Sequence, residues 1–290
     1  MKRSRDLWHE LCEKYEHPDN LPTWEEAGKW TKDKLYFWKR YIDITTAAMV
    51  GNRAFPGGLV YVDLFGGAGV CSLKGSNRRF PGSVIIAAHA KKAFSKIIVC
   101  ENDPSLAEAC RIRLSQSGTK SEIELLTGDC NILIHQVVAK IPARSLTLAF
   151  IDPKGLDAQF NTIETLAKST RTDFVILFAD AYDINRNHEH VYRQDLNSKL
   201  DQVLGPYNDW RSKLDKLSNP DHITKRQLFA DIYKRQLEKL LGYNFFDEKV
   251  MKCRGKPLYR LVYASKDKLG LKFWQEAVKE DSSGQRNLFD

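Results

Sequence analysis

The sequence lacks several features that would assign a class at once. It contains no apolar run of about 18 residues, which argues against a membrane-spanning helix. It has no internal repeat and no low-complexity segment, and disordered, collagen-like and coiled-coil classes are excluded by composition. The charged N-terminus is not followed by an apolar stretch, so we expect no secretory signal.

The six cysteines lack the spacing of a metal site. None stands in a C-x-x-C pair and none has a histidine at ligand spacing, so we expect neither a zinc site nor an iron–sulfur cluster. Because no targeting segment is expected, the reducing cytoplasm is the predicted compartment.

What the sequence does contain is a globular composition with excess positive charge. Its 290 residues are 42% hydrophobic, and 45 Lys and Arg against 37 Asp and Glu give a formal net charge of +8. The excess is local, because residues 205–275 contain 16 Lys and Arg against 8 Asp and Glu. This imbalance indicates an anionic partner, and nucleic acid is the expected one.

Two zones of different character follow one another along the chain. Residues 1–50 are rich in aromatic and charged side chains, with helical spacing over residues 31–50, and Pro56-Gly57-Gly58 then breaks the pattern. The aromatics predict a helical layer on the main domain, with nucleobase stacking as the alternative. From residue 59, short β-branched runs alternate with helical stretches. The predicted strands are 59–65, 96–101, 123–127, 145–151 and 173–178, and the predicted helices are 84–94, 104–115, 131–139 and 161–169.

This alternation predicts an α/β fold with a Rossmann-like, mostly parallel sheet covered on both faces. After Asp180 the alternation stops, and a substrate-side insertion is expected at about 180–222. The remaining predicted elements are a helix at 223–241, a C-terminal antiparallel hairpin of strands 249–253 and 258–264, and a helix at 269–280. This is the architecture of class I S-adenosylmethionine-dependent methyltransferases. We therefore expect an N-terminal helical extension over 1–56 and a methyltransferase-like domain over 57–290.

The most informative motif is the run Asp63-Leu64-Phe65-Gly66-Gly67-Ala68-Gly69, directly after the first predicted strand. Its glycines allow a sharp turn and a close approach of the backbone to a ligand. The spacing is not G-x-G-x-x-G, which disfavours a dinucleotide site. D-x-F-x-G-x-G resembles the first motif of nucleic-acid methyltransferases, which holds the methionine end of S-adenosylmethionine. We therefore assign Asp63, Phe65, Gly66, Gly67 and Gly69 to cofactor binding, with a structural strand–helix turn as the alternative.

Two further acids end predicted strands. Glu101 ends the second strand, where a carboxylate can accept hydrogen bonds from ribose hydroxyls, and a solvated acid is the alternative. Asp129 ends the third strand, where it can accept from the adenine amino group or cap the next helix. Both are predicted cofactor residues.

The run Ile151-Asp152-Pro153-Lys154-Gly155 ends the fourth strand. Amino-methyltransferases carry Asp/Asn-Pro-Pro-aromatic here, whose carboxylate or amide orients the target amine, so that catalysis is largely positioning. Asp152 and Pro153 match this motif, whereas Lys154 and Gly155 depart from it. We predict Asp152, Pro153 and Lys154 as the catalytic set. Lys154 is a candidate for contact with phosphate or a substrate carboxylate, or is simply exposed.

The basic region of residues 205–275 carries interleaved aromatic side chains. Lys252, Arg254 and Lys256 lie close together in the predicted hairpin and are predicted substrate residues, with Arg260 as a neighbour. Basic residues beside aromatics suit phosphate contact with base stacking. A solvated face over core aromatics is the alternative.

The motifs together resemble the three-Cys-motif partner proteins across about residues 30–290. The matching runs are 61–69, 81–83, 150–156, Asn185-Arg186-Asn187, 205–210 and 257–265. The resemblance implies a methyltransferase-like fold and a radical-SAM-like partner with a three-cysteine motif, often in phage or mobile elements. Asn185 and Arg186 are predicted substrate residues.

Three hypotheses follow. The first is a methyltransferase that uses S-adenosylmethionine and acts on nucleic acid or a modified nucleoside. The second is a non-catalytic scaffold for the three-Cys-motif protein. The third is a metal-dependent nuclease or hydrolase, for which Asp63, Glu101, Asp152 and Lys154 would have to converge on a divalent metal.

Overall fold

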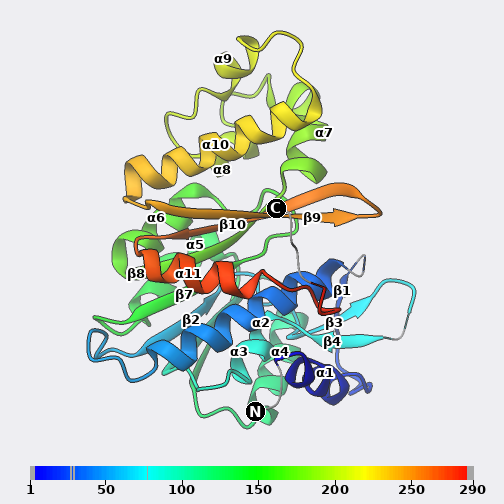
Figure 1. The fold of residues 1–290 in the computed structure, drawn as a ribbon, viewed down its shortest axis with the longest axis vertical. Helices are drawn as coiled ribbons and strands as arrows, with labels where there is room; N and C mark the ends of the chain where they lie inside the picture. The colour runs from blue at the N-terminus through cyan, green and yellow to red at the C-terminus, as the bar shows by residue number, and fades with distance from the viewer. Residues whose placement is uncertain (1–3, 27, 29, 77, 286–290) are drawn as a thin grey trace.

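A seven-stranded sheet forms the centre of the molecule (Figure 1). The computed structural model describes residues 4–26, 28, 30–76 and 78–285. The strands of this sheet are β2 (Leu59–Asp63), β5 (Lys96–Glu101), β6 (Glu122–Thr127), β7 (Leu146–Ile151), β8 (Arg171–Phe178), β9 (Phe245–Cys253) and β10 (Lys256–Ser265). Their order across the sheet is β6-β5-β2-β7-β8-β10-β9. The first five strands in this order, β6, β5, β2, β7 and β8, are parallel to one another. Strand β10 is antiparallel to both of its neighbours, β8 and β9.

This arrangement confirms the predicted fold class. The chain leaves β2 toward β5 and β6 and then returns to β7 on the other side of β2, so the strand order reverses between β2 and β7. Ligands of open α/β sheets bind beyond the carboxyl ends of the strands at such a point. The predicted loops at residues 63–69 and 152–155 both start there.

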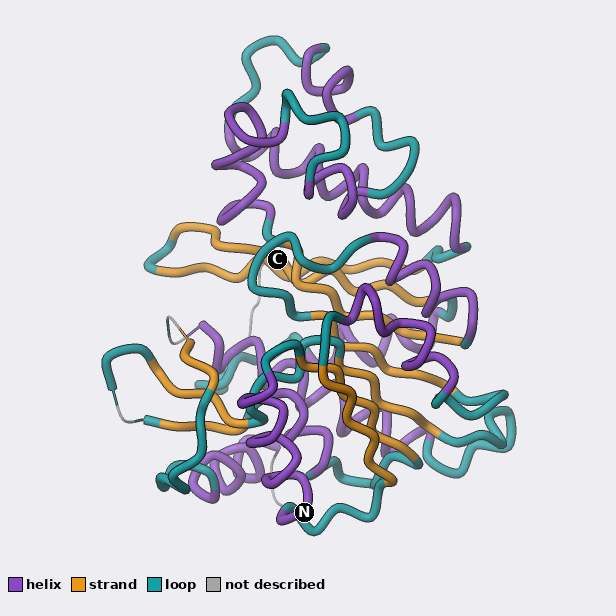
Figure 2. Tube along the Cα trace, turned by 180° about the vertical axis from the view of Figure 1, so that it is seen from behind, coloured by secondary structure: helices purple, strands orange, loops and turns teal. Residues whose placement is uncertain are grey.

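Helices cover both faces of the sheet (Figures 1 and 2). One face carries α2 (Trp30–Met49), α3 (Ser83–Ala88), α4 (Pro104–Gln116) and α11 (Lys268–Ala277). The other carries α5 (Cys130–Ala139) and α6 (Phe160–Ser169). The N-terminal α1 (Ser4–Lys14) packs beside α2.

Helix α2 is part of the core. Trp38 stacks on Phe150 of β7 with ring centroids 4.6 Å apart, and Tyr41 donates a hydrogen bond to buried Asp173 at 3.0 Å. The predicted helical layer is therefore confirmed for four aromatic residues of α2 that are buried, namely Tyr36, Phe37, Trp38 and Tyr41. Trp24 and Trp30 have a different position, described below.

One predicted helix is too long, and one small sheet was not predicted. Helix α3 ends at Ala88 rather than at residue 94, because the following segment turns toward α2, where the Lys91 backbone N–H donates to Asp43.

The small sheet consists of β1 (Trp24–Glu26), β3 (Val70–Leu73) and β4 (Arg79–Pro81). Strand β1 is parallel to β3, with Trp24 opposite Cys71.

The segment after β8 forms a helical lobe, at the top of Figure 1. Its elements are the π-helical η1 (Asp180–Ile184), α7 (Asn185–Asn187), the π-helical η2 (His188–Tyr192), α8 (Lys199–Leu204), α9 (Trp210–Asp215) and α10 (His222–Leu241). Buried Asp180 joins the lobe to the sheet, because it accepts from Arg226 of α10 at 3.1 Å and from Arg260 of β10 at 2.8 Å. No helix among the described residues has the length and hydropathy needed to cross a membrane.

Candidate active site at the carboxyl end of the sheet

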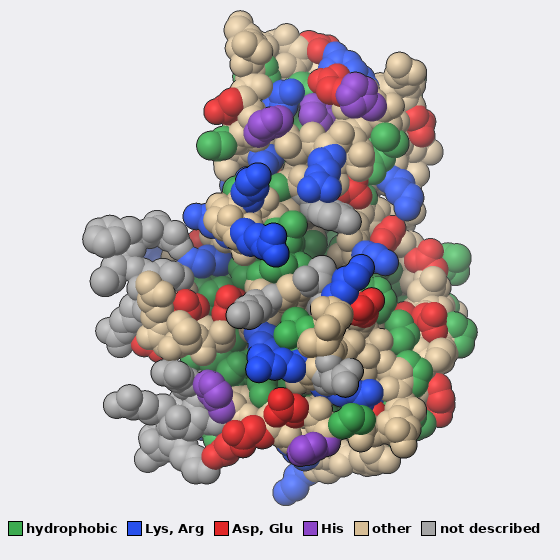
Figure 3. All heavy atoms as spheres, turned by 90° about the vertical axis from the view of Figure 1, so that its right-hand side faces the viewer, with side chains coloured by type: hydrophobic (Ala, Val, Ile, Leu, Met, Phe, Trp, Pro, Cys, Tyr) green, Lys and Arg blue, Asp and Glu red, His purple; other side chains and the backbone are tan. Residues whose placement is uncertain are grey.

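A cavity of about 760 Å³ lies at the strand ends where the sheet order reverses. Its walls come from the loops after β2, β5, β6 and β7, from β1 and α2, from α8, and from the β9–β10 hairpin. The lining includes Trp24, Trp30, Lys34, Phe65, Gly66, Gly67, Gly69, Ser83, Glu101, Asp129, Asn131, Asp152, Pro153, Lys154, Lys199, Gln202, Cys253, Leu258 and Tyr259. On the face seen in Figure 3, Lys and Arg side chains gather around a hollow with hydrophobic side chains inside it.

The glycine loop packs too closely for side chains. A Cβ at Gly66 would lie 2.3 Å from Cγ1 of Val99, and Gly67 and Gly69 have φ angles of +57° and +75°. The Gly66 N–H donates to the Cys100 carbonyl at 3.0 Å, which holds the loop against β5. The backbone therefore forms the cavity floor itself, as a site for close ligand approach requires.

Asp63 lies beneath this loop rather than in the cavity wall. Its side chain is buried and accepts hydrogen bonds from the Tyr61 hydroxyl at 2.8 Å and the Phe65 N–H at 3.1 Å. Burial raises the pKa of Asp63 to about 6, although hydrogen bonds from Ser83, Tyr61 and Phe65 act against the rise. The geometry makes Asp63 a residue that holds the loop in place.

Glu101 links two segments of the cavity. One carboxylate oxygen accepts from the Gly67 N–H at 2.7 Å, and the other accepts from the Asp103 N–H at 2.8 Å. Each carboxylate oxygen has a second lone pair, so both can still accept from ligand hydroxyls. The side chain is 8% exposed and lines the cavity.

Asp129 belongs both to a helix cap and to the cavity wall. It caps α5 by accepting from the Asn131 N–H at 2.8 Å, and it also lines the cavity. Asn131, which sequence reasoning missed, lines the cavity as well and donates to the Asp157 carbonyl at 2.8 Å.

Asp152 is paired with Lys34, a residue of α2 that sequence reasoning missed. The ammonium group of Lys34 donates to Oδ2 of Asp152. Both residues line the cavity, and the Asp152 side chain, 17% exposed against 2% for Lys34, is the more exposed member of the pair. The two residues are 118 positions apart, and no local pattern in the sequence connects them.

The residues after Asp152 form a loop, as predicted. Pro153 and Lys154 line the cavity, and the Lys154 ammonium lies 5.8 Å from the ring centroid of Trp24. A Cβ at Gly155 would lie 3.1 Å from Oδ2 of Asp183, a tight contact that requires the Asp183 side chain to shift slightly.

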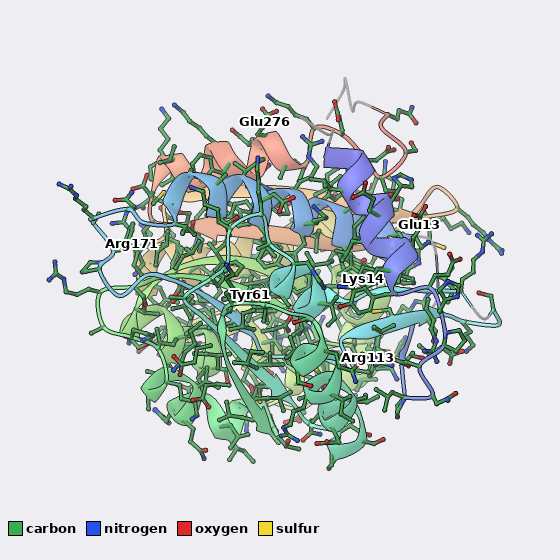
Figure 4. All side chains as sticks on the ribbon, turned by 90° about the horizontal axis from the view of Figure 1, so that it is seen from below. Glu13, Lys14, Tyr61, Arg113, Arg171 and Glu276 are labelled. Carbon is green, nitrogen blue, oxygen red and sulfur yellow. The ribbon has the colours of Figure 1, made fainter. Side chains whose placement is uncertain are left out.

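The segment before β1 is tied to the glycine loop by Arg113 of α4, labelled in Figure 4. The buried guanidinium of Arg113 bonds to Asp19 at 2.7 Å, to the Pro22 carbonyl at 2.7 Å and to the Ala68 carbonyl at 2.6 Å. The pKa of Asp19 is held well below its usual range, chiefly by the hydrogen bond from Arg113. This tie holds Trp24 beside the loop, 3.6 Å from the position of a Cβ on Gly67.

The predicted substrate residues divide into two groups. Lys252, Arg254 and Lys256 are exposed at the hairpin tip, where their neighbour Cys253 lines the cavity. Asn185 and Arg186 lie in α7 of the helical lobe and do not line it.

One expectation about the basic region is wrong, and one open alternative is decided. Arg260 is 4% exposed and bonded to Asp180 and Glu248, so it belongs to a buried ion network and not to a basic surface. Of the aromatics interleaved in this region, Tyr243 and Trp274 are buried, with their rings packed against Phe174 and Tyr263, so the alternative of core aromatics holds for these two.

The four residues required for metal-dependent hydrolysis do not form a shared site. Asp63 is buried beneath the loop, whereas Glu101, Asp152 and Lys154 line the cavity. In the described part of the chain, no group of three or more His, Cys, Asp or Glu side chains is placed to hold a metal ion.

Comparison with known proteins adds support at the level of the fold. No family model and no curated protein matches the chain. Protein LPL1258 from Legionella pneumophila, of the family model DUF519, is 9% identical with a TM-score of 0.51, over 90% of this chain and 96% of that one. A putative O-methyltransferase from Klebsiella pneumoniae is 10% identical with a TM-score of 0.46, over 92% and 91%. The O-methyltransferase from Bacillus cereus in complex with SAH is 11% identical with a TM-score of 0.43, over 92% of both chains.

The two similarities with TM-scores below 0.5 support no inference about this chain. The similarity to LPL1258 extends over nearly the whole of both chains and shows a shared fold. With the strand order and directions described above, the chain has a Rossmann-like α/β fold with a mostly parallel sheet.

Proposed function

We propose that this protein is an S-adenosylmethionine-dependent methyltransferase that acts on nucleic acid or a modified nucleoside. The observation that carries the proposal is the cavity floor, where Glu101 accepts from the Gly67 N–H beside a loop too tight for side chains. This cradle lies beyond the carboxyl ends of the strands at the reversal of the sheet order, as for nucleotide-type ligands of open α/β sheets.

The residues present fit the cofactor. The backbone of Gly66 and Gly67 lines the cavity, Glu101 offers acceptors to the hydroxyls of the cofactor, and Asp129 and Asn131 line the same cavity. When bound, S-adenosylmethionine supplies an electrophilic methyl group carried on a sulfonium. This chain's residues then have to bind and orient the acceptor, and Asp152 lines the same cavity.

The nucleic-acid part of the proposal rests on the hairpin tip. Lys252, Arg254 and Lys256 are exposed next to a residue of the cavity wall, so a backbone bound there would lie beside the site. The three-Cys-motif part rests on the sequence resemblance, which implies a radical-SAM-like partner.

Transfer of a labelled methyl group tests the proposal. We expect wild-type protein, alone or with a three-Cys-motif protein, to transfer label from S-adenosylmethionine to RNA or DNA, and Asp152→Ala to transfer far less. If the protein forms a complex with the three-Cys-motif protein but transfers no label, and Asp152→Ala forms the complex equally well, the scaffold role is favoured instead.

A further inference from the structure

A second cavity, of about 370 Å³, lies at the opposite end of the sheet, where β7 and β8 begin. Its walls come from residues 54–55, 141–145 and 169–171, the segments before β2, β7 and β8. The same two strands β7 and β8 end at the first cavity, described above. Figure 4 shows Arg171 of the second cavity well apart from Arg113, which is tied to the glycine loop. The two cavities are therefore separate.

The loop before β7 places an arginine in this cavity through an unfavourable backbone conformation. A Cβ at Gly57 would lie 2.2 Å from the Ala143 carbonyl oxygen, so the segment before β2 packs closely on this loop. Arg144 lines the cavity and has a φ angle of +60°, in a region that glycine and asparagine adopt more easily. An arginine at such a position indicates a use for its side chain, since the backbone does not favour it.

Positive charge gathers at the second cavity. Arg144 is exposed, and Arg171, whose side chain is 46% exposed, lines the same cavity. One nitrogen of the Arg171 guanidinium pairs with Asp267 at 2.6 Å, which leaves its other N–H groups for a ligand. The pKa of Lys266 is lowered, first by burial and then by the positive charge of Arg171. An anion bound at Arg171 would reduce this repulsion.

The hydroxyl of Ser145 gives an independent indication of a ligand. Ser145 is 2% exposed and lines the second cavity, and none of the described residues forms a hydrogen bond with its Oγ. Buried polar groups in folded proteins nearly always have a partner, so an unpartnered one indicates a bound ion, ligand or water. An acceptor oxygen bound in the second cavity would supply the missing partner.

We propose that the second cavity binds the phosphate group of a small phosphate monoester, held by Arg144 and Arg171 and by a hydrogen bond from Ser145. The inference is independent of the proposed function. Guanidinium groups suit phosphate because their planar N–H donors match its oxygens. A monoester carries nearly two negative charges at pH 7, since its second ionisation has a pKa of about 6. It therefore matches two guanidinium groups better than a singly charged diester of a nucleic-acid backbone does.

Calorimetry on the full chain with glycerol 3-phosphate and dimethyl phosphate tests the site and its ligand class. We expect wild type to bind glycerol 3-phosphate, and to bind it more tightly at pH 7 than at pH 5 because the ligand gains its second charge between them. Dimethyl phosphate, which is singly charged at both pH values, should bind about tenfold more weakly at pH 7. Absence of glycerol 3-phosphate binding would overturn the inference. Equal binding of the two compounds would also overturn it, because a backbone diester would then fit as well.

Two variants locate the ligand without disturbing the fold. Ser145→Ala removes a buried hydroxyl that lacks a partner, so it should leave the free energy of unfolding unchanged or higher, yet bind glycerol 3-phosphate about tenfold more weakly. Arg144→Asn keeps a residue that tolerates the φ angle of +60° and should also bind several-fold more weakly.

Arg78→Asn is the matched control, since Arg78 is exposed just before β4 and does not line the second cavity. It should bind glycerol 3-phosphate like wild type. If Ser145→Ala and Arg144→Asn also bind like wild type, the ligand does not occupy the second cavity and the inference is overturned.

Discussion

Close packing around Gly66 is the residue-level feature on which the cavity floor depends. In Gly66→Ala the new methyl group would meet Cγ1 of Val99, so we expect a loss of about 1–3 kcal/mol in the free energy of unfolding from overpacking. Chemical denaturation measures the loss. Because Val99→Ala removes the clashing atom, the double variant should lose less than the sum of the single variants. If the stability losses of the two single variants simply add up in the double variant, the new methyl group does not meet Val99.

The buried carboxyl of Asp63 gives a second prediction at this scale. Its pKa is raised from 3.8 to about 6 mainly by burial, so the folded protein holds this proton more tightly than the unfolded chain does. The resulting stabilisation is fully present below pH about 4 and is lost as the pH rises through about 6.

The shift corresponds to about 3 kcal/mol. Between pH 4 and 7, wild type should therefore lose stability relative to Asp63→Asn by an amount of that order. Denaturation curves across this range measure the difference. Parallel pH profiles for the two proteins would contradict the assignment.

Residues of the site were predictable only where a local pattern marks them. The glycine loop, Glu101 and Asp152 follow strands directly, and the structure places all of them at the cavity or beneath it. Lys34 and Trp30 carry no such mark, because their partners Asp152 and Tyr259 are far away in sequence. Arg260 was misassigned for the same reason, since burial is a property of the folded neighbourhood.

Most elements follow from their apolar periodicity. Strand β5 and helix α2 agree with prediction within one residue, because each is long enough to show its period. The small sheet was missed because β3 and β4 have only 4 and 3 residues and β3 pairs with the distant β1. Pairing between remote short segments leaves no periodic signal.

The hairpin tip between β9 and β10 is the element we expect to contact the nucleic-acid backbone. Changing Lys252, Arg254 and Lys256 to Gln should weaken binding of single-stranded oligonucleotides. It should also make the slope of log affinity against log salt shallower by about 2, since each phosphate contact contributes about 0.7. Binding titrations at several salt concentrations measure both effects.

The matched control changes the exposed Lys239 of α10 and the exposed Lys268 and Lys272 of α11 to Gln, which removes the same charge away from the hairpin tip. It should leave the salt dependence nearly unchanged. If both triple variants behave alike, net charge and not the hairpin tip governs binding.

At the scale of the whole molecule, the fold brings segments from both ends of the chain to one cavity. The N-terminal segment supplies Trp24 and Lys34, residues 63–69 supply the glycine loop, and the C-terminal hairpin supplies Tyr259. Only part of the positive charge behind the net value of +8 lies on the surface near the cavity. Lys252, Arg254 and Lys256 are exposed at the hairpin tip, whereas Arg226 and Arg260 are buried against Asp180.

The central claim is that the cavity floor binds S-adenosylmethionine, and isothermal calorimetry tests it most directly. We expect wild type to bind one S-adenosylmethionine per chain. Glu101→Ala should bind at least about tenfold more weakly, because it loses a carboxylate that accepts from two backbone segments. The control Glu108→Ala, on the exposed surface of α4, should bind like wild type. Absence of binding by wild type, or equal affinity in Glu101→Ala, would contradict the account.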